Sequence, residues 1–345
     1  MDFPVSSLGS AGTVLAAGDG EFITAVRGFY KERNVQPYEE LEKKWAEWNH
    51  LDPVGMVVCS SGTAALHLAL ECVFQHQEVY TSDYNMIAVP RAIKLSGKFP
   101  RFSDHDVPDP HWPKIGHIVV HVYGRKPWRV YPDSTVIEDL AEAHGISPRE
   151  ETNAACWSFY KNKIVAGEEG GAVWFRDPYH AVIARELRSL GFTPDHNYRH
   201  RPRGHNYRLS NCHAELILRS LAKVDDNIKR RQDGVGWMDE FIPEQWKQPP
   251  RDANWVYDLR IPGLKRNQMT EIVRLLNEWG IGARHGFYPM TGQEEFRDET
   301  GPKRNPNAWL AADEVFYLPI PFIRQHAREM MNSLLLAVAT AAPLV

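Results

Sequence analysis

The chain has 345 residues, of which 43% are hydrophobic and 24% are charged, and this composition excludes a disordered or low-complexity protein. Its 40 Lys and Arg residues stand against 44 Asp and Glu residues, so the net charge of −4 argues against non-specific nucleic-acid binding as its main role. The longest strongly apolar stretch, Leu334–Ala339, is too short to span a bilayer.

From residue 56 onward, short β-prone segments alternate with helix-like segments, after a polar, helix-like stretch at Tyr38–Asn49. Alternation of this kind predicts an α/β fold with a largely parallel sheet. The helix-like segments include Thr63–Phe74 and Asn85–Leu95, and Pro90 is expected to kink or shorten the second of them. The β-prone segments are Met56–Cys59, Glu78–Thr81, His117–Tyr123, Thr135–Glu138, Cys156–Tyr160 and Ala172–Phe175.

The last third of the chain shows a different pattern, which predicts a second, smaller α+β domain. One long helix is expected at Cys212–Arg231, ahead of the polar stretch Pro243–Asp252. We place a large domain at residues 1–235 and a small C-terminal domain at residues 236–345. The expected elements of the small domain are the strands Trp255–Arg260 and Ala283–Phe287 and the helices Gln268–Trp279 and Ile323–Ala339.

The first motif that could carry chemistry is the turn Ser60-Ser61-Gly62-Thr63, which joins an apolar strand to an Ala/Leu-rich helix. The N–H groups at such a helix start can bind phosphate, and glycine lets the backbone approach the ligand closely. The same residues also form an ordinary helix N-cap, so this motif alone leaves both interpretations open.

Two further motifs follow β-prone segments. The acids Glu138 and Asp139 come at the end of one segment, where open α/β sheets place their ligand-binding crevice. A carboxylate there can hold the protonated ring nitrogen of a cofactor, although acids also commonly begin a helix. Another segment, Cys156–Tyr160, delivers Lys161 and Lys163 into a loop before a glycine-rich turn. The composition of this loop does not choose between the two lysines, and a solvated turn is the alternative.

Together the three motifs offer partners for a phosphate, a cationic ring nitrogen and an aldehyde, which are all parts of pyridoxal phosphate. The chain resembles the DegT/StrS family of pyridoxal phosphate-dependent sugar aminotransferases of fold type I, and its motif spelling is closest to perosamine-synthase-like members. The resemblance covers roughly residues 54–345 and rests on the order of the motifs. These are Ser61–Leu70, Ile137-Glu138-Asp139 with Ala143-His144-Gly145, Ser158-Phe159-Tyr160 with Asn162-Lys163 and Glu169-Gly170-Gly171, His121–Gly124 and Asn206–Asn211.

The resemblance implies a large domain with a mostly parallel sheet between helices, a smaller C-terminal α+β domain, and roles for several residues. Lys163 matches the family's Schiff-base lysine, which also moves the proton of the reaction. Asp139 matches the aspartate that keeps the pyridine nitrogen protonated. The residues that match the phosphate-binding cup are Gly62, Thr63 and Ser158.

Three more residues follow from the resemblance. Asn206 matches an asparagine that the family passes to the cofactor phosphate of the neighbouring subunit, which implies a homodimer with shared active sites. Glu142 lies where the family places a residue near the 3-hydroxyl of the cofactor, and perosamine-synthase-like members also have Glu there. The strict match to the family's ring-stacking aromatic is Met86, and we take the nearby Tyr84 as the stacking residue.

Two departures from the family pattern concern the sugar site and the connection between two strands. The family's Tyr-Pro-Leu-His becomes Tyr288-Pro289-Met290-Thr291, which removes a histidine near the sugar site and leaves Tyr288 as a substrate-binding candidate. Only thirteen residues, Arg125–Ile137, separate Gly124 from Glu138, close to the shortest connection between parallel strands. The helix that the family has there is therefore expected to be reduced to a loop.

The resemblance implies an aminotransferase that moves an amino group, with glutamate as the expected donor, to a nucleotide-linked keto-sugar. The shortened connection and Thr291 motivate an alternative, an aminotransferase acting on a non-sugar ketone or aldehyde. A non-catalytic regulatory protein with the same fold is the third possibility, and the presence of Lys163, Asp139 and Ser158 argues against it.

The loop before Cys212 carries Arg199, Arg201 and Arg203, which could form a basic rim for the diphosphate of a nucleotide or simply a solvated loop. The 15 histidines raise the question of a metal. Their two clusters lack the spacing of known metal motifs, so no metal is expected. The clusters are His111, His117 and His121, and His196, His200 and His205.

The compartment is expected to be the cytoplasm. Met1–Ala17 contains no basic residue, so it does not have the pattern of a signal peptide. The four cysteines lie far apart without a CxxC pair, which is typical of reduced thiols. We therefore expect small-molecule substrates and a second copy of the chain as partners, and neither nucleic acid nor membrane.

Overall fold

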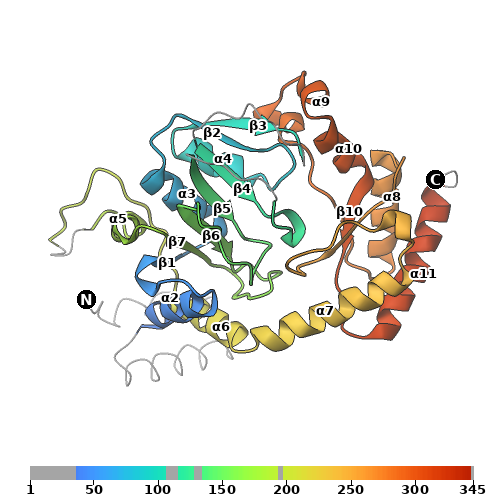
Figure 1. Ribbon diagram of the computed structural model, residues 1–345, viewed down its shortest axis with the longest axis horizontal. Coiled ribbons are helices and arrows are strands. Elements are labelled where there is room, and N and C mark those ends of the chain that lie inside the picture. The colour runs from blue at the N-terminus through green and yellow to red at the C-terminus, as the bar shows by residue number, and fades with distance from the viewer. Residues whose placement is uncertain (1–35, 106–115, 128–133, 193–196, 343–345) are drawn as a thin grey trace, which may run out of the picture.

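The computed structural model describes residues 36–105, 116–127, 134–192 and 197–342, and its larger sheet confirms the expected α/β architecture (Figure 1). Seven strands lie in the order β1-β7-β6-β5-β4-β2-β3. Strand β7 is antiparallel to both of its neighbours, and the other pairs are parallel. The strands are β1 Met56–Cys59, β2 Glu78–Ser82, β3 Phe99–Ser103, β4 Gly116–Val120, β5 Thr135–Asp139, β6 Ala154–Ser158 and β7 Gly171–Phe175.

Helices cover both faces of this sheet because its central strands are apolar on both sides. Val57 and Val58 of β1 belong to different hydrophobic clusters, as the alternation of side chains along a strand requires. One cluster joins the sheet to α3 Gly62–Val73, α4 Ala88–Leu95 and α5 Pro178–Arg188. The other joins it to α2 Pro37–Trp48 and α6 Asn211–Leu221.

The C-terminal part has a small antiparallel sheet in the order β8-β10-β9 and a hydrophobic cluster of its own. Helix α7, Val224–Phe241, runs from the large sheet to this part, where α8 and α11 lie (Figure 1). The proposed division at residues 235 and 236 falls inside α7, whose Val224 and Met238 belong to different clusters. The further elements are β8 Tyr257–Arg260, α8 Arg266–Glu278, β9 Arg284–His285, α9 Gly301–Arg304, α10 Pro306–Glu314, β10 Val315–Leu318 and α11 Arg324–Ala341.

Several element boundaries differ from the sequence-based expectation. The single helix expected at Cys212–Arg231 is broken at Lys223, whose φ of −116° and ψ of 13° leave the helical region. Helix α7 then continues past Gly234, where a Cβ atom would lie 2.2 Å from the Pro321 carbonyl oxygen. Glycine at position 234 therefore lets helix α7 pack directly against the backbone of Pro321. The strand expected at His117–Tyr123 ends at Val120.

Short connections and caps agree better with expectation. Helix α4 begins at Ala88, so Pro90 lies in the first turn, where a helix needs no backbone donor. The described part of the connection between β4 and β5 holds only the short 3-10 turn η4 Val122–Gly124. No helix in the described part of the chain is long and apolar enough to cross a membrane.

Candidate active site

Lys163 lies in the loop after β6, and its side chain is only 11% exposed. Its Nζ atom is 3.8 Å from Glu142 Oε1 and 3.9 Å from the centre of the Trp255 ring. Burial lowers the pKa of the Lys163 amine, and the negative charges of Glu142 and Asp139 offset part of this effect. Lys161 is exposed. The structure thus places Lys163, and not Lys161, among buried acids.

Asp139 ends β5 with its carboxylate on the side of Lys163, whereas the preceding Glu138 points to the other face of the sheet, as strand alternation requires. The Ala141 N–H donates to Asp139 Oδ1 at 3.0 Å. In the described part of the chain, Asp139 Oδ2 has no hydrogen-bond partner, and burial raises the pKa of this carboxyl group. An oxygen of this kind suits a cationic N–H donor.

Glu138 forms a separate buried pair with His121. Glu138 Oε2 lies 2.5 Å from His121 Nε2, and Glu138 Oε1 accepts a hydrogen bond from the Arg149 N–H at 2.7 Å. Burial alone would raise the pKa of Glu138, but the hydrogen bond and charge of His121 outweigh it and lower the pKa to about 2. This pair therefore links the end of β4 to β5 on the face of the sheet opposite Asp139, and it does not contact Lys163.

Glu142 is buried beside Lys163 and is anchored by the backbone. Its Oε2 accepts a hydrogen bond from the Tyr123 N–H at 2.8 Å, and Tyr123 has a φ of 53° that directs this N–H toward the carboxylate. Burial raises the pKa of Glu142 to about 7, although the positive charge of Lys163 opposes the shift. Its protonation can therefore change near neutral pH.

His144 fixes the loop that carries Lys163, and the sequence analysis gave it no role. Its Nε2 donates to the Ser158 carbonyl at 3.0 Å, while its Nδ1 accepts from the Val165 N–H at 3.2 Å. These two bonds require the neutral ring, and burial accordingly lowers the pKa of His144 to about 3. The only sequence signal for this role was its place in the Ala143-His144-Gly145 motif.

The start of α3 lies against the end of β6. A Cβ atom at Gly62 would be 2.8 Å from the Ser158 Cβ atom, so only glycine fits in this place without displacement. Ser61 Oγ caps the helix by accepting from the Ala64 N–H at 3.1 Å. Gly62 and Thr63 form the first two positions of the helix, whose N–H groups have no acceptor within it. The structure thus brings Gly62, Thr63 and Ser158 together.

Tyr84 is almost completely buried, at 1% exposure, between the two parts of the chain. Its hydroxyl oxygen is 3.0 Å from that of Tyr123, and its ring packs against His105 and Phe287. Burial raises the pKa of the Tyr84 hydroxyl. Met86, the strict match to the stacking position, is 51% exposed. The stacking role of Tyr84 stays a prediction.

The contacts of the substrate-side candidates are with residues other than Lys163. Arg201 Nε contacts Glu186 at 3.1 Å, and Arg203 Nη1 lies 3.8 Å from Glu71. Arg199 is exposed and its backbone N–H contacts Asn197. The ring of Tyr288 packs against Trp309, and Asn206 is exposed, with a β-bridge to Ser189.

Thr291 stands where the resemblance places a histidine, and it is buried against Asp83. Its side chain is 1% exposed and donates to Asp83 Oδ2 at 2.7 Å, while its own N–H donates to Asp83 Oδ1 at the same distance. Asn305 completes the group with a bond of 2.8 Å to Oδ2. Position 291 therefore joins the β2–α4 connection to the C-terminal part instead of facing a substrate.

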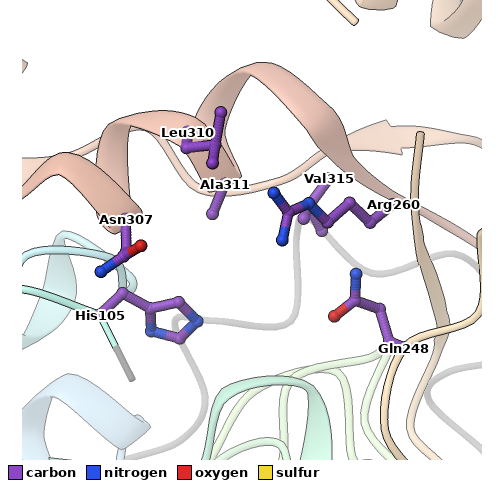
Figure 2. Close-up of a pocket in the computed structure, with 7 residues that line it drawn as sticks. All are labelled: His105, Gln248, Arg260, Asn307, Leu310, Ala311 and Val315. Atoms are coloured by element: carbon purple, nitrogen blue, oxygen red, sulfur yellow. The ribbon is translucent and has the colours of Figure 1, made fainter. Parts of the chain in front are cut away.

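A cavity of about 190 Å³ lies between the edge of the large sheet and the C-terminal part (Figure 2). Figure 2 shows the polar ends of His105, Gln248 and Arg260 facing a common space. The His105 ring is 4.8 Å from that of Tyr84, and the Tyr84 hydroxyl contacts that of Tyr123. The cavity therefore lies next to the aromatic residues that connect to Glu142 through the Tyr123 N–H. The sequence analysis proposed none of its lining residues for a functional site. They are His105, Gln248, Arg260, Asn307, Leu310, Ala311 and Val315.

The chain matches known proteins along most of its length. The model of the DegT/DnrJ/EryC1/StrS aminotransferase family matches residues 132–331. The GDP-perosamine synthase of Caulobacter vibrioides is 28% identical over 285 residues, or 73% of this chain and 76% of that protein. The dTDP-3-amino-3,4,6-trideoxy-alpha-D-glucose transaminase of Micromonospora megalomicea subsp. nigra is 31% identical over 225 residues, or 57% of this chain and 59% of that protein.

Among solved structures, 3-amino-5-hydroxybenzoic acid synthase is similar, with a TM-score of 0.79 at 20% identity, over 93% of this chain and 97% of that chain. This likeness concerns the fold. It confirms the expected α/β fold of type I with a mostly parallel sheet between helices.

Proposed function

The chain belongs to the DegT/DnrJ/EryC1/StrS aminotransferase family and is a pyridoxal phosphate-dependent aminotransferase, and we propose that it moves an amino group from glutamate to a nucleotide-linked keto-sugar. The observation that carries the proposal is the buried Lys163 amine beside Glu142. The names of the perosamine synthase and the aminosugar transaminase that it resembles support a sugar acceptor.

The residues present fit the cofactor. The backbone at Gly62 leaves room only for hydrogen beside Ser158, which suits a phosphate approaching the start of α3. Asp139 Oδ2 is available for the cationic ring nitrogen, and the Lys163 amine for the aldehyde. When bound, pyridoxal phosphate supplies an electron sink that stabilises negative charge on the carbon next to the transferred nitrogen.

Each acid and base of the site then has a distinct task. Asp139 holds a proton on the ring nitrogen, because a cation restores the charged carboxylate that burial disfavours. Lys163 Nζ, whose pKa burial lowers, takes the proton from the α-carbon of the donor and later delivers one to the carbon that receives the amino group. Glu142, at 3.8 Å, balances the positive charge that Lys163 carries between these transfers.

The acceptor could instead be a non-sugar ketone or aldehyde, and one observation favours this second candidate. Thr291 is buried in the Asp83 group, so position 291 offers no polar side chain to a sugar. We keep the nucleotide-linked sugar as the first proposal because Glu142 agrees with the perosamine-synthase-like spelling. A non-catalytic role is dropped, since the chain belongs to an aminotransferase family.

We further propose that the active form is a homodimer in which Asn206 of one chain reaches the cofactor phosphate of the other. Asn206 is exposed, and its described bridge is to Ser189 rather than to the residues around Lys163. We also propose a cytoplasmic location, which four cysteines that form no disulfide support.

The role of Lys163 is tested by trapping the bond between the protein and its cofactor. Borohydride reduction of the holoenzyme followed by intact mass measurement is expected to add the mass of one cofactor to the wild type and to Lys161→Ala. Lys163→Ala is expected to add none and to lose transamination, because it lacks the buried amine. Cofactor mass on Lys163→Ala but not on Lys161→Ala would show that the other lysine carries this role.

The substrate is tested with the visible spectrum of the holoenzyme. Glutamate is expected to change the band of the bound cofactor, and one member of a panel of nucleotide-linked keto-sugars is expected to reverse the change. Reversal only by non-sugar carbonyl compounds would select the second candidate. A band that glutamate leaves unchanged while another amino acid alters it would refute glutamate as the donor.

A further inference from the structure

Three side chains of metal-binding type meet outside the candidate active site. His67 and Glu71 lie one turn apart on α3, and His205 reaches them from the loop before α6. One ligand atom from each of the three residues lies within 4.8 Å of the other two. Glu71 Oε2 is 3.2 Å from His205 Nε2, and Glu71 Oε1 is 3.8 Å from His67 Nε2.

The ring of His67 has the surroundings of a metal ligand. It is 3% exposed, and its Nδ1 lies 3.1 Å from the hydroxyl of Tyr207. Its buried Nε2 faces the cluster and has no hydrogen-bond partner in the described part of the chain. Metal-binding histidines usually hold one nitrogen with a second group in this way and present the other to the ion. A bound cation would therefore satisfy the His67 nitrogen that has no hydrogen-bond partner among the described residues.

We propose that His67, Glu71 and His205 form a binding site for a divalent transition metal of the Zn²⁺ type, with a fourth position open to water. Two imidazoles and one carboxylate are a donor set that Zn²⁺ prefers, and three protein ligands with one open position are typical of accessible zinc sites. The site is additional to the proposed transamination, whose residues are Lys163, Asp139 and Glu142.

The proposal replaces the sequence-based expectation that no histidine cluster holds a metal. That expectation grouped His205 with His196 and His200. In the structure, His200 Nδ1 instead faces the Leu190 carbonyl at 2.9 Å, and His196 lies outside the described residues. The true partners, His67 and Glu71, precede His205 by more than 130 residues, and only the fold brings them together.

Arg203 is a cation that competes with a metal ion for Glu71. Its Nη1 lies 3.8 Å from Glu71 Oε1, but its side chain is 70% exposed, whereas that of Glu71 is 7% exposed. An ion pair with one exposed arginine contributes little free energy, so a metal ion can displace the guanidinium into solvent.

The position of the cluster indicates what the metal would do. Helix α3 begins at Gly62 of the proposed phosphate cup, and His205 precedes Asn206, the residue that we propose reaches the partner chain. An ion bound to both segments would fasten the loop of Asn206 to α3. This consequence rests on the proposed function, but metal binding itself does not.

Zinc retention by the holoenzyme tests the site. Tag-free protein, treated with a chelator and then dialysed against Zn²⁺, is expected to retain about one zinc ion per chain by elemental analysis. Glu71→Gln and His205→Phe each remove a ligand and are expected to retain no more zinc than the buffer contains. His200→Phe, on the same loop, is the matched control and is expected to retain zinc as the wild type does. Tyr207→Phe is expected to weaken zinc affinity about 10–100-fold, because it removes only the group that orients His67.

Thermal unfolding separates loss of the site from loss of the fold. Zinc is expected to raise the melting temperature of the wild type and of His200→Phe but not of Glu71→Gln, which should still bind the cofactor. A wild type that retains no zinc, or ligand variants that retain as much as the wild type, would overturn the proposal. Because neither readout is enzyme activity, a wrong proposed function would leave these results unchanged.

Discussion

The carboxyl group of Glu142 is buried beside the Lys163 amine, and this burial has a cost that depends on pH. Burial raises the pKa of Glu142 to about 7 from a usual value of 4.5. Between these two pH values the folded chain holds a proton on Glu142 that the unfolded chain has already lost. The proton therefore stabilises the fold at low pH, and this stabilisation is lost as the pH rises toward 7.

We predict that Glu142→Gln removes this dependence. Relative to the variant, the unfolding free energy of the cofactor-free wild type should fall by up to about 3 kcal/mol between pH 4.5 and pH 7. Urea unfolding at pH 5 and pH 8 measures the difference. Glu150→Gln, at an exposed position, is the control and should keep the wild-type slope. Parallel pH profiles for wild type and Glu142→Gln would contradict the buried carboxyl group as the cause.

Residues could be proposed from the sequence where a local pattern fixes their place. Asp139 follows an apolar strand, and alternation along that strand turns Asp139 and Glu138 to opposite faces. His144 and His67 could not be assigned a role, because their partners Val165 and Tyr207 lie 21 and 140 residues further along the chain. Their environments depend on tertiary contacts that no local pattern records.

At the scale of elements, the start of α3 and the end of β6 form one unit through the contact between Gly62 and Ser158. We predict that Gly62→Ala weakens cofactor binding about 10–100-fold, because the added Cβ atom would lie 2.8 Å from that of Ser158, and overpacking of this kind costs about 1–3 kcal/mol. Titration of the cofactor-free protein with pyridoxal phosphate measures the dissociation constant.

Two further variants show whether contact with Ser158 is the cause. Ser158→Gly removes the opposing Cβ atom together with its hydroxyl, so Gly62→Ala should cost less cofactor affinity in the Ser158→Gly background than in the wild type. Gly282→Ala places a methyl group where no atom lies within 4 Å and should leave the dissociation constant unchanged. Wild-type affinity in Gly62→Ala would show that the backbone at this position does not approach the ligand.

The elements that the sequence did not indicate lack a clear local signal. Strand β3 contains Pro100 and Arg101, and among the described strands it pairs only with β2. Edge strands of this kind carry no long apolar run. Strand β10 follows α10 directly, without a turn residue between them. Helix α5 did have a signal, since Asp177 caps it and Pro178 occupies its first position.

At the scale of the whole molecule, the C-terminal part closes the site that the large sheet opens. The Trp255 ring covers the Lys163 amine, and its Nε1–H donates to the Asn162 carbonyl at 2.8 Å. The buried Asp83 group with Thr291 joins the two parts on another side. Asn206 is exposed, and we propose that it serves the cofactor phosphate of a second chain rather than that of its own.

Under this proposal a second copy of the chain supplies Asn206 to each site. Complementation between two inactive variants tests whether the two chains share their active sites. The Lys163→Ala chain lacks the amine but can still place Asn206 in the site of the partner chain. The Asn206→Ala chain keeps the amine but has no amide to place in the partner's site. Each homodimer should therefore have little activity. In the mixed dimer, one site has both defects and the other has none. Random exchange of subunits makes half of the dimers mixed, so activity should recover to about a quarter of the wild-type value.

The measurement needs only mixing under conditions that allow subunit exchange, followed by an assay of transamination. Recovery of a quarter of the wild-type activity requires that Asn206 acts in the site of the other chain. If Asn206 served its own chain, the mixed dimer would carry one defect in each site and activity would stay at the level of the parents. Full activity of the Asn206→Ala homodimer would remove the asparagine from the site altogether, and with it the physical reason for sharing sites between two chains.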